Sequence, residues 1–552
     1  MKTMIKKYLI ALSLFSFFSL SVLSQDKFGP ITLSYGQEIE DNKQKIVQIS
    51  GEINGKIYTL ANKGKKYYVK VFDSAEMKLI STNLIEFPEL KNKDLDFESL
   101  KVIGNKIYVF GSMYDRKNKE FDLAAIEINA DGTLNDAQKV IFKTPVTKKK
   151  ERGAFYFKKS PVENKLLVMH ATLFDKEEAI QYEIKLFDED LNEITSHLEK
   201  VPFEDRRDLE FSISDFDISF KDDIFLIINE SYRDRKQKKN IEKFEIHAFK
   251  KDKNYEKEVI KLDFENKEVI NCAMLATQDG LLQFVGFYSS VNKRGKANWK
   301  LKGIYSGTVD INSNEVLNLK FNEFDYETKV KLIGERRAKK GKDVKPYYQT
   351  HSLIEKPNGG LILLSEYQLV YVGRTGGIGP LGITPIQFTK NEIIVTSLNP
   401  DGTVEWSNVI AKKQRAAYST LSIGFFGFAG SSNFSVGVGI AIPVSQLGKG
   451  PEYLGAIPIF ENGKLTVVFN DHKKNTGVTD IEEIRSLGNY NKSIPTAFTF
   501  DDNGKITRLD PQELQEERLI LRPGVYYRKS PKEYIIYSSR RSKDKLGRLI
   551  ID

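Results

Sequence analysis

The chain has 552 residues, one cysteine and a formal net charge of +9, from 84 lysines and arginines against 75 aspartates and glutamates. A single cysteine excludes an intramolecular disulfide, and Cys272, in the apolar run 269–274, is expected to be a buried hydrophobic residue and not a catalytic thiol. The length exceeds what one ordinary hydrophobic core supports, so we predict several domains or a repeat array.

The first 24 residues have the order of an export signal. Lys2, Lys6 and Lys7 precede an uncharged stretch at 8–23, and small residues lead to a cleavage point before Gln25. The alternative is an uncleaved membrane anchor, because the uncharged stretch is close to bilayer length. We expect export to the periplasm, the outer membrane or the medium, with no transmembrane helix in residues 25–552.

One four-strand pattern recurs along the chain. An apolar stretch such as 100–103 is followed by a Gly/Asn/Asp turn and a second strand, then an alternating strand such as 182–187. A tight Asp-Gly or Asn-Gly turn and a short last strand such as 404–406 complete the unit. The second strand has eight visible copies, at 55–60, 105–111, 164–168, 223–228, 279–285, 359–364, 463–469 and 532–537.

Four antiparallel strands in units of roughly 50 to 60 residues are typical of a β-propeller blade. The eighth copy has only three strands before the chain stops, and an isolated strand at 30–35 precedes the first full unit. We therefore predict an all-β fold, with residues 25–552 forming a single propeller of about eight four-stranded blades. The N-terminal strand would close the ring by joining the C-terminal blade. Seven blades is the alternative, because the later copies are irregularly spaced.

This repeat resembles the β-propeller repeat proteins that bacteria export, over essentially the whole chain after the signal. It matches no named subfamily. Among the eight copies, only the one at 359–364 begins with the glycine pair of kelch repeats, Gly359-Gly360. The Trp-Asp ending of WD40 blades is absent, and the turn at 399–406 is a single loose copy of the sialidase Asp-box. The resemblance implies the fold and no particular activity.

Long insertions are expected on one face of the ring. In a meander, the links from strand two to three and from blade to blade share one face, and the other two kinds of turn share the opposite face. The insertions at 323–348, 367–390, 414–450 and 471–495 belong to the first set, which we call the long-loop face. Lysine-rich loops are often merely solvated, but several on one rim would attract an anionic partner. The basic candidates are Arg233, Arg235, Arg294, Arg336 and Arg337.

One part of this face is expected to be apolar. Residues 416–448 contain no charged side chain, and the alternation at 434–444 predicts a strand that pairs with 424–428. This hairpin either packs on the charge-poor segment 370–388 and caps the ring, or projects and binds a protein or the envelope surface. The apolar candidates for binding are Phe425, Phe426, Phe428, Val438 and Ile440.

Residues 377–382 formally match G-x-G-x-x-G, but Pro380 and Pro385 forbid the helix that a dinucleotide site needs, so we reject the match. No other catalytic or cofactor motif is present, and the five histidines are widely spaced. Tyr347, Tyr348 and His351 stand at the start of the sixth unit, where propeller enzymes often place channel residues. Our first hypothesis is a non-enzymatic binding or scaffold protein without metal or cofactor, whose partner is a protein, an envelope component or an anionic polysaccharide. The alternative is a hydrolase or lyase that acts on an acidic polysaccharide. It would need paired carboxylates at the channel, whereas a channel filled by Leu, Ile and Phe favours the scaffold. Nucleic acid fits poorly with export.

Overall fold

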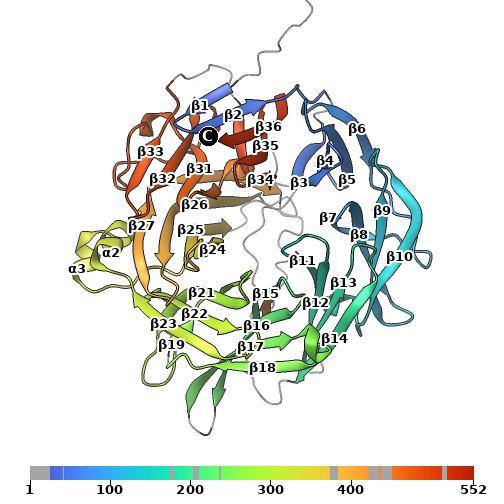
Figure 1. Ribbon diagram of the computed structural model, residues 1–552, viewed down its shortest axis with the longest axis horizontal. Coiled ribbons are helices and arrows are strands. Elements are labelled where there is room, and N and C mark those ends of the chain that lie inside the picture. Colours follow the sequence, from blue (N-terminus) through green and yellow to red (C-terminus); the bar gives the residue numbers. More distant parts are fainter. Residues whose placement is uncertain are drawn as a thin grey trace, which may run out of the picture.

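The computed structural model describes residues 25–552, except 41–42, 175–178, 203–209, 235, 237, 266, 373–382, 422–433, 437–449, 513–518 and 542. Eight sheets surround a central axis as the blades of a β-propeller (Figure 1). The predicted all-β fold is confirmed, with eight blades and not seven. The predicted signal at 1–24 lies outside the described residues. Within the described ranges, no helix is both long enough and apolar enough to span a bilayer.

The first four blades use their strands in chain order from the axis outward. Blade one contains β3 (Lys45–Ile53), β4 (Lys56–Lys63), β5 (Lys66–Asp73) and β6 (Leu79–Leu84). Blade two contains β7 (Asp96–Ile103), β8 (Lys106–Asp115), β9 (Glu120–Ile128) and β10 (Leu134–Pro145). Blade three contains β11 (Ala154–Lys159), β12 (Leu166–Phe174), β13 (Ala179–Phe187) and β14 (Glu193–Pro202). Blade four contains β15 (Glu210–Ile218), β16 (Ile224–Asp234), β17 (Lys239–Phe249) and β18 (Lys257–Leu262).

The other four blades follow the same plan with additions. Blade five has a divided inner strand, and it contains β19 (Lys267–Val269), β20 (Ala273–Ala276), β21 (Leu281–Ser290), β22 (Gly303–Asp310) and β23 (Val316–Glu323). Blade six contains β24 (Tyr348–Glu355), β25 (Leu361–Val372), β26 (Ile383–Leu398) and β27 (Val404–Ile410), and β28 (Gln414–Leu421) pairs with β26. Blade seven contains β30 (Ile457–Glu461), β31 (Lys464–His472), β32 (Ser493–Phe500) and β33 (Ile506–Leu509). Blade eight contains β34 (Ile520–Arg528), β35 (Glu533–Arg540), β36 (Lys543–Ile551), β2 (Ile31–Tyr35) and β1 (Gln25–Phe28).

The two ends of the described chain meet in blade eight, as predicted. β2 pairs antiparallel with β36, so that Leu33 lies opposite Leu549, and both side chains are buried. β1 adds a fifth strand outside β2. This pairing leaves β36 without an exposed edge and ties the first described residues to the last.

Tight turns join neighbouring blades. The Asn83 amide on β6 donates a hydrogen bond to the Asp131 carbonyl, in the Asp-Gly turn of the next blade, at 2.9 Å. The Asn408 amide on β27 likewise donates a hydrogen bond to the carbonyl of Gly504, in the Asn-Gly turn of blade seven, at 3.0 Å. Gly504 has φ +74°, a backbone conformation that favours glycine. The Asp-Gly and Asn-Gly turns are therefore hairpin turns and blade contacts at once.

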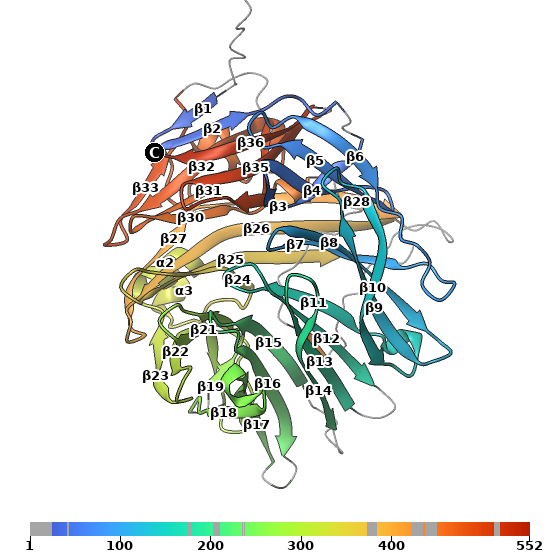
Figure 2. The same cartoon turned by 45° about the vertical axis from the view of Figure 1, so that its right-hand side comes forward.

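The strands that flank the long insertions end on one face of the ring, as the strand order requires. The link from β23 to β24 contains α2 (Tyr326–Ile333) and α3 (Glu335–Lys339), and the link from β31 to β32 contains η5 (Lys473–Asn475) and η6 (Tyr490–Lys492). Much of the predicted insertion 367–390 continues β25 and β26 beyond the body of the blade, as Figure 2 shows by the length of these strands on the way to β28. The sixth blade therefore carries a raised sheet on this face.

Part of the charge-free segment crosses the ring. β29 (Phe434–Val436) is a strand, as predicted, and its described partner is β15, the inner strand of blade four, to which it runs parallel. A link between blades six and seven thus reaches the inner strand of blade four, two blades away from blade six. The predicted partner strand 424–428 lies outside the described residues, as do the five apolar binding candidates Phe425, Phe426, Phe428, Val438 and Ile440.

Candidate functional site

A cavity of about 730 Å³ lies on the long-loop face beside α3. In Figure 1, α2 and α3 lie at the outer rim, next to β27 of blade six. The cavity is lined by Lys300, Ile333, Gly334, Glu335, Arg336, Arg337, Lys340, Lys342 and Glu482. Blade five, the helical link and the β31–β32 link of blade seven all contribute to it.

Local interactions hold the helical link in place. The Asp325 carboxylate caps α2 by accepting the backbone N–H of Thr328 at 2.6 Å, and Gly334, with φ +80°, turns the chain from α2 into α3. Lys331 donates to the Asn408 side-chain oxygen on β27 at 2.8 Å. Leu301 and Val344 form a two-hydrogen-bond bridge (2.9 and 3.1 Å), and both side chains are buried. That bridge brings Lys300 and Lys342 to the same cavity.

The cavity is strongly basic. Five of its nine lining residues are cationic, and none of these five has an ion pair within the described part of the chain. Of the two acidic lining residues, Glu335 is paired with Lys339 at 2.6 Å. On α3 the small side chain of Ala338 is buried, whereas Arg336 and Arg337 are exposed. Unpaired guanidinium and ammonium groups in a concave surface can bind carboxylates, phosphates or sulfates by charge-assisted hydrogen bonds.

The structure brings together only part of the predicted basic rim. Arg336 and Arg337 share the cavity. Arg233, near the end of β16, and Arg294, in the link from β21 to β22, are exposed on a neighbouring part of the face. There the Arg294 carbonyl accepts the backbone N–H of Asn240 at 3.0 Å. Arg235 lies outside the described residues. Lys340 and Lys342 lie in the predicted insertion 323–348 with Arg336 and Arg337, but nothing in the sequence pattern indicated Lys300 as their neighbour.

Tyr347, Tyr348 and His351 do not form one constellation. Tyr348 is buried between blades five and six and donates a hydrogen bond to Glu392 at 2.6 Å, and burial raises its pKa. Tyr347 is exposed, with its ring edge against Tyr367. His351 lies on β24 beside Ser352, and burial lowers its pKa. Tyr348 therefore serves the packing of two blades, and the three side chains offer no shared reaction centre.

On the side of blades five to eight, the channel contains a cavity with a single carboxyl group. A cavity of about 470 Å³ lies between the inner strands of blades five to eight. Its lining consists of Leu275, Ser352, Leu353, Ile354, Glu355, Pro458, Phe460, Tyr526, Arg528 and Tyr534. Glu355 is the one carboxylate in this lining, and burial raises its pKa. A polysaccharide hydrolase of the usual type needs two carboxyl groups, and the lining contains only one.

One cluster of three carboxylates has the geometry of a metal site. Among the described residues, Asp115, Glu120 and Asp122 can direct oxygens at one point. The Lys91 ammonium is at that point, 3.0, 3.6 and 2.8 Å from the three carboxylates. Burial by itself would lower the pKa of Lys91, but hydrogen bonds to Asp122 and Asp115 raise it overall. The protein thus supplies its own cation here.

A buried ion-pair network supports the base of the charge-free segment. Glu366 on β25 and Lys412, just before β28, are both completely buried and lie 2.8 Å apart. Lys390 on β26 contacts the second Glu366 oxygen at 3.2 Å. Sequence analysis missed this network, because single charged residues in alternating strands are usually exposed.

The sequence matches no protein-family model, and no curated protein matches it. Solved structures match in fold. The Dos1 propeller is 8% identical, with a TM-score of 0.39 and coverage of 93% of this chain and 94% of that chain. The polysaccharide lyase Uly1 is 8% identical, with a TM-score of 0.33 and coverage of 94% and 99%. Prolyl oligopeptidase B from Galerina marginata is 7% identical, with a TM-score of 0.36 and coverage of 90% and 55%. At such low identity the likeness concerns the β-propeller fold alone.

Proposed function

We propose that the protein is an exported binding propeller that holds an acidic polysaccharide on its long-loop face, in the cavity beside α3. The observation that carries this proposal is the presence of five cationic side chains without ion pairs around a cavity of about 730 Å³. A cavity of that size exceeds the needs of a single phosphate or carboxylate. It suits a run of anionic groups, such as successive uronate or sulfated sugars.

The alternative, a hydrolase or lyase acting on such a polymer, has less support. The cavity between the inner strands of blades five to eight contains one carboxylate, and Tyr347, Tyr348 and His351 share no common centre. Binding alone requires only positioned cations and an accessible surface, and the long-loop face has both.

Direct binding measurements test the proposal. Trp299, which is 49% exposed and directly precedes Lys300, is a fluorescence reporter within the same link. The probes are size-defined oligogalacturonate, heparin oligosaccharides and a neutral oligosaccharide. We expect saturable binding of the anionic probes and none of the neutral one. Because a hydrogen bond to a charged group contributes about 1.5–3 kcal/mol, Arg336→Gln/Arg337→Gln should weaken binding by at least tenfold.

The matched control is Lys345→Gln in the same link. Lys345 is exposed and does not line the cavity. Its replacement should therefore change affinity by less than about threefold. If each variant weakens binding in proportion to its lost charge, or if no anionic probe binds, the cavity is not the binding site.

A further inference from the structure

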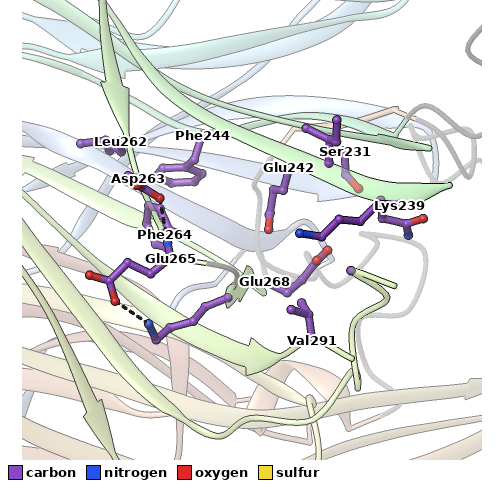
Figure 3. Close-up of a pocket in the computed structure, with 14 residues that line it drawn as sticks. Ser231, Lys239, Glu242, Phe244, Leu262, Asp263, Phe264, Glu265, Glu268 and Val291 are labelled. Atoms are coloured by element: carbon purple, nitrogen blue, oxygen red, sulfur yellow. Dashed lines mark hydrogen bonds and ion pairs between the residues drawn. The ribbon is translucent and has the colours of Figure 1, made fainter. Parts of the chain in front are cut away.

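A second cavity on the same face has the opposite charge. It has a volume of about 250 Å³ and lies between blades four and five, where β16 and β17 face β19 and the β21–β22 link. Glu242 and Glu268 extend into it from opposite walls, and Phe244, Leu262 and Phe264 form its apolar side (Figure 3).

The two carboxyl groups have few donors. One Glu242 oxygen accepts the Asn229 amide at 2.8 Å and the Val269 backbone N–H at 3.2 Å, whereas its other oxygen, Oε2, is buried and accepts no N–H. Glu268 is 8% exposed, and its carboxyl hydrogen-bonds to that of Glu242 when the Glu242 carboxyl is protonated.

Burial and this proximity disfavour ionisation. Burial, followed by the charge of Glu268, raises the pKa of Glu242 to about 8. Burial, followed by Glu210, raises the pKa of Glu268 to about 7. The other charged lining residues are Lys239, Asp263, Glu265 and Lys267, of which Lys267 is paired with Glu265 at 3.1 Å.

Elsewhere the same chain neutralises its buried carboxylates with ammonium groups. Lys91 lies among Asp115, Glu120 and Asp122 at 2.8–3.6 Å, and Lys412 lies 2.8 Å from Glu366. In the described part of the chain, neither Glu242 nor Glu268 has such an ion pair. When both carboxyls are ionised, the hydrogen bond between them is lost, and three of their four oxygens then have no donor among the described residues. A primary ammonium group has three N–H donors.

We propose that Glu242 and Glu268 form a binding site for an external alkylammonium group, of the kind carried by a lysine side chain of a partner protein. The apolar wall suits the methylene stem of such a side chain, and the two carboxylates receive its ammonium head. A calcium ion fits less well, because it takes six to eight oxygen ligands and no third carboxylate of the described residues joins this pair.

Ligand-observed NMR titration tests the site, with Nα-acetyl-lysine amide as the probe and its Nε-acetylated form as the neutral control. Only the charged probe should bind saturably. Binding should tighten at least threefold from pH 6 to pH 8.5, because the carboxyls must lose a proton that the ammonium group replaces. Glu268→Gln should weaken binding at least tenfold, and Glu265→Gln, at the rim of the same cavity, by less than twofold. If Glu268→Gln does not fold, Glu242→Gln replaces it.

Several results would overturn the assignment. Equal binding of the charged and acetylated probes would do so, as would binding that survives both Glu268→Gln and Glu242→Gln. Saturable Ca²⁺ binding that depends on Glu268 and displaces the amine at stoichiometric concentration would make the pair a metal site. Glucosamine is a third probe. If it binds more tightly than the lysine derivative, the ligand is an amino sugar and the partner-lysine assignment is wrong.

Discussion

Lys412→Met tests whether buried charges hold the base of the long-loop face. The Lys412 ammonium donates to Glu366 at 2.8 Å and to the Lys390 carbonyl at 3.1 Å, and the side chains of Lys412 and Glu366 are fully buried. Methionine has a similar shape but no charge, so the variant leaves Glu366 buried with Lys390 as its cationic partner at 3.2 Å. Removing one member of a buried ion pair costs about 3–5 kcal/mol. Because Lys390 remains, we expect the free energy of unfolding to fall by about 3 kcal/mol.

The double variant Lys412→Met/Glu366→Leu separates the ion pair from simple packing. When both charges are removed together, neither is left buried and unpaired, and such replacements are often close to neutral. We expect the free energy of unfolding of the double variant to lie within about 1.5 kcal/mol of the wild-type value, since a few backbone acceptors lose their donor. Urea unfolding followed by circular dichroism measures all three proteins. Additive losses, or a loss below about 1 kcal/mol for Lys412→Met, would refute the reasoning.

Acid unfolding gives an independent measure of the same network. Burial alone would raise the pKa of Glu366, but Lys412 and Lys390 hold it at about 2, below its usual 4.5. The stabilisation is therefore present above pH 4.5 and lost as the pH falls towards 2. At about 1.4 kcal/mol per pKa unit, this carboxylate accounts for about 3 kcal/mol of acid sensitivity. Lys412→Met should reduce this acid sensitivity.

Three further predictions concern closure, alkaline stability and the thiol. Leu33→Asp places a carboxylate in the closed blade, where Leu33 is 1% exposed, and should lower the free energy of unfolding by more than about 3 kcal/mol in urea titration. The exposed Lys27→Asp is its control, and equal losses would argue against closure by β2. The raised pKa values of Glu242 and Glu268 mean that the folded state binds extra protons, so their contribution to stability should fall as the pH rises from 4.5 to about 8. Glu268→Gln should flatten that decline in thermal unfolding scans, and an unchanged slope would contradict it. Cys272 is buried and burial raises its pKa, so Ellman's reagent should label it in 8 M urea but not in buffer, and rapid native labelling would show an accessible thiol.

The architecture could be predicted because each blade repeats its own local signals. Period-two alternation and the Asp-Gly turns determine where strands begin and end, and the three-strand eighth copy left a place for β2. Even the face that carries the insertions follows from counting strands. None of this requires knowledge of which distant side chains meet.

The charged sites depend on contacts between blades and could not be predicted in the same way. Glu242 occupies an ordinary polar position in an alternating strand, and it becomes enclosed only because β19 of blade five approaches it. The pairing of β29 with β15 is a further case, since alternation indicates that 434–436 is a strand but not which blade receives it. The basic cavity could be predicted only in part. Arg336 and Arg337 are adjacent in the sequence, whereas Lys300 joins them only because the Leu301–Val344 bridge brings its segment close.

The two proposed binding cavities share one structural element, the link from β21 to β22. Val291 and Gly295 form part of the acidic wall, and Lys300 forms part of the basic one. A rearrangement of this link would disturb both cavities, whereas loss of a charge at one should leave the other intact. Arg336→Gln/Arg337→Gln should therefore retain amine binding, and Glu268→Gln should retain polyanion binding. Only this crossed pattern separates two independent charge-specific sites from one collapsing loop, because a misfolded link would lower both affinities in either variant.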